Sequence, residues 1–301
     1  MSEKDNEFSL LDRFKDIQPQ DINWFPGHML KAEKELSGQL KRVDAVLELR
    51  DARIPLASVN PRFEKSLGTK QRLILFNKTS LADEQVTQAW SRFFQKSRQP
   101  FLFIDVLQNR GLRKILPMAR ETMLERWDRF RAKGIRPPPL RLMVVGIPNV
   151  GKSSLINRLA HRKAAGTGPA PGVTRHQEWI LLGREVELLD TPGILIPKIE
   201  SLEKGFHLTL TGAVKDEIVG AENLAEFLLD ALRSRSLEKL SRCYGLSETQ
   251  LESGLAEMLG HIGSLRGCLK KGGVDRTRAA AMLLKDFREG SLGPVSFEMP
   301  G

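Results

Sequence analysis

Residues 146–153 (GIPNVGKS) restrict the fold of this chain more than any other stretch of its sequence. They fit the G-x-x-x-x-G-K-[ST] loop, whose backbone N–H groups wrap phosphate oxygens at the N-terminus of a helix. Residues 141–145 before the loop are typical of a short buried strand, and residues 154–159 after it are predicted to form a helix. A strand, a Gly-rich loop and a helix in this order predict a phosphate-binding site in an α/β domain.

The residue types in this loop predict individual roles. Lys152 brings a positive charge to the β and γ phosphates of a nucleotide and takes part in catalysis, and the hydroxyl of Ser153 is a ligand for Mg²⁺. Glycine lets the backbone approach the phosphates closely. The loop and the first turn of its helix therefore supply the predicted nucleotide-binding residues Asn149, Val150, Gly151, Lys152, Ser153 and Ser154.

Two stretches downstream of the loop fit the same kind of site. Residues 190–193 (DTPG) follow a predicted strand, where Asp190 is predicted to hold Mg²⁺ and the N–H of Gly193 to reach the γ-phosphate. Residues 171–174 (PGVT) precede that strand, and Thr174 is predicted to bind the nucleotide and the metal and to take part in catalysis. Each stretch alone is an ordinary turn, but downstream of a phosphate-binding loop the two predict a nucleotide-dependent switch.

A candidate base-reading motif lies upstream, where Asn77 and Lys78 follow a predicted buried strand. An Asn-Lys-x-Asp motif reads guanine, because its carboxylate accepts hydrogen bonds from N1–H and N2–H₂ of the base. Here Ser80 stands in the fourth position, and a hydroxyl does not replace two charge-assisted bonds of about 1.5–3 kcal/mol each. The identity of the base therefore stays open, and an Asp in place of Ser80 is expected to tighten guanine binding.

The apolar pattern divides the chain into three parts. Residues 1–20 are predicted to be a polar leader, residues 21–204 a nucleotide-binding α/β domain, and residues 205–301 a helical domain. Residues 137–139 (PPP) form a connector that cannot be helical. The predicted strands are 43–49, 72–76, 100–104, 141–145, 179–182 and 186–189, and the predicted helices are 82–96, 112–133, 154–159, 222–233, 237–244, 249–259 and 277–289.

The composition limits the partners and the compartment of the protein. A formal net charge of +10 favours polyanions as partners, although a basic protein without such a partner has the same composition. Cys243 and Cys268 form no CxxC pair and are expected to be reduced thiols. No apolar run is long enough to span a membrane, and the N-terminal residues resemble no targeting signal, so we expect a cytoplasmic protein.

The order of the motifs is unusual, because Asn77 precedes the phosphate-binding loop and the DTPG stretch comes last. In this order the chain resembles the circularly permuted GTPases, and specifically the ribosome-biogenesis family of the RbgA/YlqF type. Residues 104–106 (IDV) stand near the place of the usual Ser-Ala-type base loop and depart from it. The other matching stretches are 23–29 (NWFPGHM), 51–55 (DARIP), 211–216 (TGAVKD) and 290–298 (GSLGPVSFE).

The resemblance implies a circularly permuted P-loop GTPase domain followed by a C-terminal all-helical domain. It implies a GTPase that binds GTP and GDP with Mg²⁺, helps to mature the large ribosomal subunit or its precursor, and contacts rRNA. It also implies that His28 orients or activates the attacking water, since Ile194 stands where many GTPases have Gln. We expect hydrolysis to be slow until the ribosome stimulates it, and the protein to be a monomer.

Three of these assignments have plain alternatives. His28 also fits a packing position beside Trp24 and Phe25. Asn149 stands where potassium-dependent relatives have a K⁺ ligand, and it equally fits a turn residue. A solvated helix surface would carry the same charges as the cations that are predicted to bind rRNA, which are Lys270, Lys271, Arg276 and Arg278.

Ser80 keeps two other functions open. One is an RNA-binding assembly factor that retains the P-loop fold but hydrolyses little or no nucleotide. The other is a P-loop enzyme that hydrolyses ATP or a mixture of purine nucleotides. The first alternative is disfavoured by the intact set of phosphate and metal candidates, Lys152, Ser153, Thr174 and Asp190.

Overall fold

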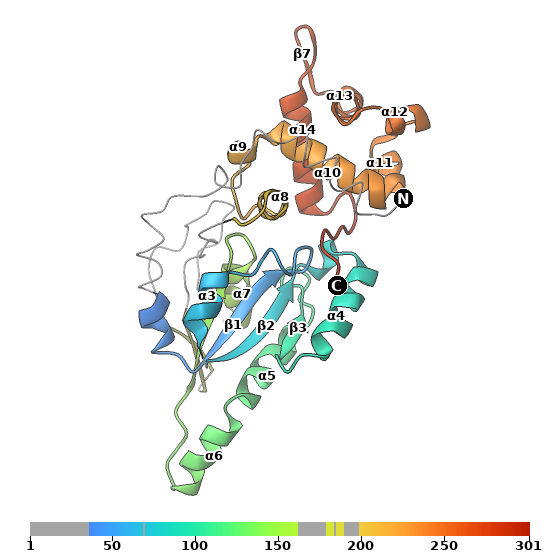
Figure 1. Ribbon diagram of the computed structural model, residues 1–301. Helices are drawn as coiled ribbons and strands as arrows, with labels where there is room; N and C mark the ends of the chain where they lie inside the picture. The colour runs from blue at the N-terminus through green and yellow to red at the C-terminus, as the bar shows by residue number, and fades with distance from the viewer. Residues whose placement is uncertain (1–35, 69, 162–178, 184, 190–198) are drawn as a thin grey trace. The chain divides into compact units, whose positions relative to one another are not determined.

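The computed structural model describes residues 36–68, 70–161, 179–183, 185–189 and 199–301. These residues divide into two compact units. The sheet unit contains the described residues up to 189 together with Glu298–Gly301, and the helical unit contains residues 199–297. The chain therefore returns to the sheet unit at Glu298, after the helical unit is complete (Figure 1).

The sheet unit is built on a six-stranded sheet in the order β3-β2-β1-β4-β6-β5. All neighbouring strands are parallel except β5, which pairs antiparallel with β6. The central strand β1 is buried along its whole length, including its charged residues Glu48, Arg50 and Asp51, because both faces of the sheet are covered. The strands are β1 (Ala45–Asp51), β2 (Gln71–Asn77), β3 (Phe101–Phe103), β4 (Leu140–Gly146), β5 (Trp179–Leu182) and β6 (Val186–Leu189).

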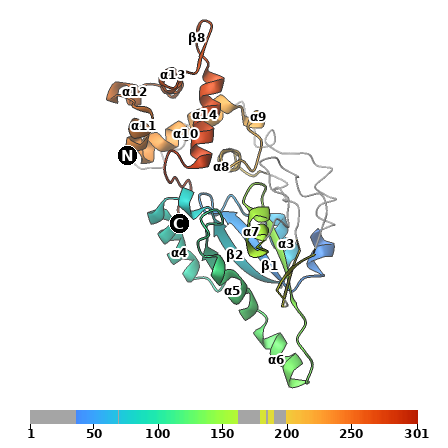
Figure 2. The same ribbon diagram turned by 180° about the vertical axis from the view of Figure 1, so that it is seen from behind.

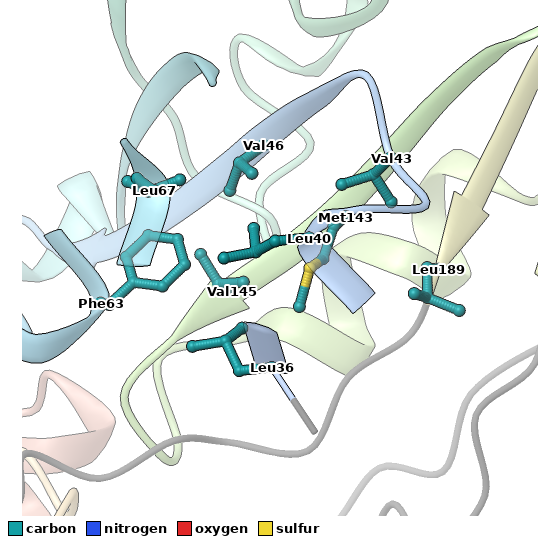
Figure 3. Close-up of a cluster of buried hydrophobic side chains, with 9 residues drawn as sticks. All are labelled: Leu36, Leu40, Val43, Val46, Phe63, Leu67, Met143, Val145 and Leu189. Atoms are coloured by element: carbon teal, nitrogen blue, oxygen red, sulfur yellow. The ribbon is translucent and has the colours of Figure 1, made fainter. Parts of the chain in front are cut away.

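Helices cover both faces of this sheet. Residues 36–40, α3 (Pro61–Leu67) and α4 (Glu84–Gln95) lie on one face, and α5 (Ile115–Glu121) and α7 (Lys152–Leu159) lie on the other (Figure 2). On the first face, α3 and residues 36–40 pack on β1, β4 and β6 through a continuous apolar cluster (Figure 3). A second cluster joins α4 to β2 and includes Trp90, Phe94 and Phe76. The parallel sheet with helices on both faces confirms the predicted α/β domain.

The predicted helix over 112–133 is wrong as a single element. It consists of a 3-10 turn (Leu112–Lys114), α5 and α6 (Leu124–Ala132). The hydroxyl of Thr122 donates to the carbonyl of Ala119 at 2.7 Å, and the N–H of Met123 donates to the carbonyl of Arg120. A side chain that occupies a helical carbonyl competes with the backbone ladder, which explains the break.

The helical unit contains α8 (Leu202–Leu210), α9 (Asp216–Val219), α10 (Ala221–Arg235), α11 (Leu237–Tyr244), α12 (Glu248–Glu252), α13 (Leu255–Leu265) and α14 (Arg276–Glu289). The core lies between α10, α13 and α14 and consists of buried Leu, Ile, Met and Phe side chains. A short hairpin of β7 (Leu269–Lys270) and β8 (Gly273–Val274) connects α13 to α14. This unit confirms the predicted helical region at the C-terminal end.

The predicted helix over 249–259 is also wrong as a single element, because Ser253 and Gly254 separate α12 from α13. Ser253 has an extended backbone conformation, and the carboxylate of Glu257 accepts from the N–H of Gly254 at the start of α13. A new N-terminus therefore begins inside the predicted helix. In the described part of the chain, no helix is both long and apolar enough to cross a membrane.

Candidate nucleotide-binding site

The carboxyl ends of β1, β2, β3 and β4 meet at one edge of the sheet because these strands are parallel. Asp51, Asn77 and Gly146 are the last residues of β1, β2 and β4, and Asp105 follows β3 after one residue. Open parallel sheets bind their ligands outside this edge. The four strands thus bring the predicted phosphate loop and the predicted base motif together.

Two glycines of the phosphate-binding loop stand where no other residue fits. A Cβ on Gly146 would lie 2.5 Å from the carbonyl oxygen of Leu49. A Cβ on Gly151 would lie 2.4 Å from Nδ2 of Asn77, and the φ of +105° at Gly151 disfavours any side chain. These glycines allow the loop to approach β1 and the base motif. The loop between β4 and α7 confirms the strand–loop–helix arrangement predicted from the sequence.

Lys152 begins α7 and lies over the loop that precedes it. Its side chain is largely buried, and Nζ donates to the carbonyl oxygens of Gly146 at 3.2 Å and Ile147 at 3.0 Å. Ser153 and Ser154 follow in the first turn of α7, and both are half-buried. The first N–H groups of a helix have no partner within the helix, so this turn and the ammonium group suit the binding of phosphate.

Asn77 connects the phosphate-binding loop to the turn after β3. Its Nδ2 donates to the carbonyl oxygen of Val150 at 2.8 Å, and its Oδ1 accepts from the N–H of Val106 at 3.0 Å. The side chain is only 3% exposed, so both bonds form away from water. Asn77 therefore fixes the spacing between the two loops in addition to any contact with a base.

Ser80 lies in a 3-10 turn (Thr79–Leu81) that follows Lys78. Its side chain is hydrogen-bonded to a carboxylate. Oδ2 of Asp105 accepts from Oγ of Ser80 at 2.5 Å and from its N–H at 3.0 Å. Oδ1 of Asp105 accepts from the N–H of Gln108 at 2.9 Å. The contribution of Asp105 was not predicted from the sequence, although its place among residues 104–106, one residue after β3, is a signal that could have revealed it.

Burial alone would raise the pKa of Asp105, but the hydrogen bonds from Ser80, Gln108 and Leu107 outweigh it and hold the pKa below the ordinary value of 3.8. The carboxylate is 2% exposed. It is therefore ionised at neutral pH and sits beside the residue that occupies the base-reading position.

A second buried carboxylate organises the end of β1. Asp51 accepts from Arg53 through both oxygens, at 2.9 Å from Nε and 2.8 Å from Nη2, and Nζ of Lys78 lies 3.0 Å from its Oδ2. Burial would raise the pKa of Asp51, but the charges of Arg53 and Lys78 hold it well below its usual range. Lys78, a predicted nucleotide-binding residue, thus has its ammonium group beside Asp51. Asp51 and Arg53 both belong to residues 51–55 (DARIP), which the sequence connected with the family resemblance but with no role.

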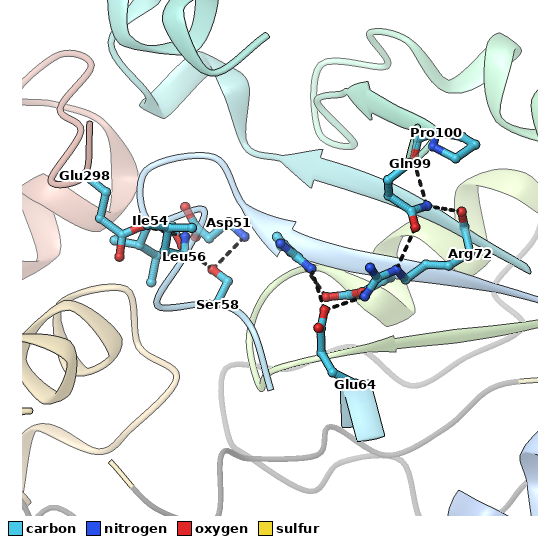
Figure 4. Close-up of polar contacts among 11 residues, drawn as sticks. Asp51, Ile54, Leu56, Ser58, Glu64, Arg72, Gln99, Pro100 and Glu298 are labelled. Atoms are coloured by element: carbon cyan, nitrogen blue, oxygen red, sulfur yellow. Dashed lines mark hydrogen bonds and ion pairs between the residues drawn. The ribbon is translucent and has the colours of Figure 1, made fainter. Parts of the chain in front are cut away.

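The loop after β1 is held by Glu298. Its carboxylate accepts from the N–H of Leu56 (Figure 4). It also accepts from the N–H of Ala57 at 2.8 Å. Its carbonyl oxygen accepts from Nε1 of Trp90 on α4 at 2.9 Å. Ser58 completes the loop by accepting from the N–H of Asp51 at 3.1 Å. The end of the chain is therefore part of the frame around the site.

The candidate catalytic residue His28, the metal candidates Thr174 and Asp190, and Gly193 lie outside the described residues. Asn149, the candidate K⁺ ligand, is half-buried with a φ of +56°.

The cations predicted to bind RNA lie in the helical unit and differ in their surroundings. Lys270 and Lys271 are exposed at the tip of the β7–β8 hairpin, and Arg278 is exposed on α14. Arg276 is half-buried, with Nη2 3.0 Å from Glu226 and Nε 3.6 Å from Glu222. Its charge is thus largely compensated within the unit, whereas the other three cations face water.

The phosphate-binding loop follows a parallel strand, and neighbouring strands bring an Asn-Lys turn and a carboxylate to the same edge of the sheet. This arrangement defines a P-loop nucleotide-binding protein. The base-motif strand β2 precedes the P-loop strand β4 in the chain. The profile of a family described as 50S ribosome-binding GTPase matches residues 141–249, which begins within β4 and leaves Asn77 upstream.

Relatives of this chain match it over nearly its whole length. Ribosome biogenesis GTPase A of Bacillus licheniformis is 45% identical, over 93% of this chain and 98% of the relative. Mitochondrial ribosome-associated GTPase 1 of Mus musculus is 37% identical, over 94% of this chain and 92% of the relative. The crystal structure of GNP-bound YlqF from T. maritima is 30% identical with a TM-score of 0.61, and covers 90% of this chain and 98% of that one.

The chain belongs to the ribosome biogenesis GTPase A family, in which YlqF has the circularly permuted GTPase fold. This confirms the predicted family, the predicted fold class and the predicted class of enzyme, a GTPase.

Proposed function

We propose that this protein hydrolyses GTP at the carboxyl edge of its sheet and that this switch assists assembly of the large ribosomal subunit. The observation that carries the proposal is the formed phosphate-binding loop, with Lys152 over it, in a chain 45% identical to a ribosome biogenesis GTPase. The basic balance of the chain, with a net charge of +10, favours a ribosomal particle as the partner.

The described residues support nucleotide binding at this edge. Lys152 and the first turn of α7 hold the phosphates, and Asn77 keeps the base side of the site in register with the phosphate side. Ser153, together with Thr174 and Asp190, offers the oxygen ligands that Mg²⁺ prefers, and the ion would offset the charge of the phosphates. Asn149 is our candidate for an additional K⁺ ligand.

Hydrolysis requires a water molecule aligned with the γ-phosphate. Ile194 has no group that orients water, so we assign this task to His28, whose imidazole can hold or accept a proton near neutral pH. With this set incomplete in the isolated protein, turnover should be slow, and contact with the ribosome should raise it.

The test is the rate of phosphate release from GTP, with and without large-subunit precursor particles. Wild type should be slow alone and faster with particles. His28→Ala should lower the stimulated rate by about 100-fold or more with little change in GDP affinity, as for a group that acts in the transition state. Equal stimulated rates for wild type and His28→Ala would leave His28 as a packing residue, and no hydrolysis by wild type under either condition would contradict the proposed function.

A purine-tolerant NTPase remains the second candidate function, and Ser80 is the observation that favours it. A hydroxyl in place of a carboxylate gives up at least one strong acceptor for guanine. Comparison of GTP and ATP hydrolysis by the same preparation decides between the two.

A further inference from the structure

Ser80 and Asp105 exchange the residue types expected at the two base-side positions. The fourth residue of the base motif is expected to be Asp and is Ser80, while the departing base loop, where a Ser-Ala type is usual, contains Asp105. The two side chains bond directly, with 2.5 Å between Ser80 Oγ and Asp105 Oδ2. The carboxylate is therefore still present at the edge of the sheet, but it comes from the turn after β3.

This contact fixes the hydroxyl of Ser80 in one role. An ionised carboxylate has no proton to give, so Ser80 must donate the proton of the bond. The length of 2.5 Å is that of a strong O–H···O⁻ bond. With its proton committed to Asp105, the Ser80 oxygen offers only lone pairs to a ligand.

We propose that Asp105 and Ser80 form a composite guanine-reading acceptor, in which Asp105 positions and polarises the hydroxyl of Ser80 toward the donors of the base. The proposal rests on the proposed function, because it assumes that a guanine nucleotide binds at this edge. Guanine presents N1–H and N2–H₂ there, whereas adenine presents an unprotonated N1. A fixed acceptor therefore still prefers guanine, with one hydroxyl oxygen in place of two carboxylate oxygens.

The same geometry changes the expectation for an Asp at position 80. The sequence alone predicts that Ser80→Asp tightens guanine binding. In the structure the new carboxylate would face Asp105 at hydrogen-bond distance, and two like charges at one site disfavour each other. Ser80→Asp alone should therefore bind GDP more weakly than wild type. Ser80→Asp combined with Asp105→Ser should bind it at least as well, because one carboxylate and one hydroxyl are restored in exchanged positions.

The decisive experiment measures selectivity as well as affinity. GDP, XDP and ADP are titrated into wild type and Asp105→Asn by calorimetry. Wild type should prefer GDP to ADP by about tenfold or more, as expected for one charge-assisted hydrogen bond. Asp105→Asn should lower both the GDP/ADP and the GDP/XDP ratio by about tenfold, since the negative charge that favours base donors and repels the C2 carbonyl of xanthine is lost. A merely structural role would weaken all three nucleotides equally and leave the ratios unchanged.

The matched control is Asp83→Asn, which changes a carboxylate three residues from Ser80 that caps α4. Asn is an equally good N-cap, so this variant should keep wild-type ratios. If Asp105→Asn does not fold, Ser80→Ala decides, because it removes only the hydroxyl and should also lower the GDP/ADP ratio. Wild-type ratios in both Asp105→Asn and Ser80→Ala would overturn the proposal while the proposed function stands. A wild type that binds no guanine nucleotide would overturn both.

Discussion

At the carboxyl edge of the sheet, charged and polar side chains are buried and bonded to one another, whereas at the β7–β8 hairpin of the helical unit they stand in water. Asp51, Asn77 and Asp105 are all at most 3% exposed, and the side chain of each forms hydrogen bonds with other residues. Lys270 and Lys271 are exposed.

This difference matches two kinds of recognition. A small ligand with a defined shape needs groups held in fixed positions, which buried and fully bonded side chains provide. A phosphate backbone needs accessible positive charge, and mobile exposed lysines can follow it without reading its sequence.

The largest effect is expected at the buried pair of Asp51 and Arg53. Asp51→Asn leaves the guanidinium of Arg53, only 1% exposed, without its charge partner. Breaking a buried ion pair on one side costs about 3–5 kcal/mol of unfolding free energy. Urea unfolding followed by tryptophan fluorescence measures this loss of unfolding free energy. All 4 tryptophans precede residue 190, so the signal reports on the part of the chain that contains Asp51 and Arg53.

Asp128→Asn is the matched control, because Asp128 pairs with Arg131 on α6 and both side chains are exposed. This variant should unfold as wild type does. An equally small effect at Asp51 would contradict the buried, organising role that we assign to it.

Acid should weaken the same pair. The pKa of Asp51 is depressed in the folded protein, so its contribution is fully present above the unfolded value of 3.8 and is lost as pH falls below that value. Wild type should therefore lose stability steeply below about pH 4, and Asp51→Asn should lose less over the same range. Parallel pH profiles of the unfolding free energy would contradict this assignment.

Lys152→Ala should abolish most nucleotide binding without unfolding the chain. The ammonium group contacts the loop through the carbonyl oxygens of Gly146 and Ile147, and loss of its bonds to phosphate should weaken GDP binding by about 100-fold. Calorimetric titration measures the affinity, and circular dichroism checks the fold. GDP affinity equal to that of wild type would exclude this loop as the phosphate site.

Reversal of charge at the hairpin should weaken RNA binding. Lys270→Glu with Lys271→Glu should lower the affinity for rRNA fragments, and the log–log salt slope should become shallower by about 1.5 as two phosphate contacts are lost. The control is Arg129→Glu with Lys133→Glu, which makes the same change of charge at exposed positions around α6. Equal losses in both variants would show that total charge alone is responsible.

The smallest loss of unfolding free energy is expected where residues Glu298–Gly301 join the sheet unit. Glu298→Gln keeps one acceptor for the N–H groups of Leu56 and Ala57 and loses the charge, which should cost about 1 kcal/mol. Because Nε1 of Trp90 donates to the backbone of Glu298, the fluorescence of Trp90 should shift if the tail detaches. An unchanged unfolding free energy and an unchanged spectrum would remove the tail from the frame of the site.

The sequence predicts those parts of the site that are continuous in the chain. The phosphate-binding loop and its helix are local, so the glycines, Lys152 and the flanking apolar strand are sufficient evidence. Asp105 lies 25 residues from Ser80, and only the pairing of β2 with β3 brings them together. The charge of Arg276 is compensated by Glu226, 50 residues away, which a local charge count does not register.

The two predicted helices that are wrong as single elements fail for a related reason, because contacts between nearby residues also escape the apolar pattern. Apolar spacing continues across Thr122 and across Ser253 and Gly254, but side-chain bonds to the backbone and a new N-terminus interrupt the helices there. Periodicity reports which residues share a face, whereas a helix ends where its backbone groups find other partners.

Hydrogen exchange of the amides with and without GDP and Mg²⁺ tests the central claim most directly, because one experiment follows both regions. We predict slower exchange at residues 146–153 and 104–108 at saturating GDP, and unchanged exchange at the β7–β8 hairpin, residues 269–274. Unchanged exchange at residues 146–153, or protection confined to the hairpin, would contradict the assignment of the nucleotide to the buried polar edge of the sheet.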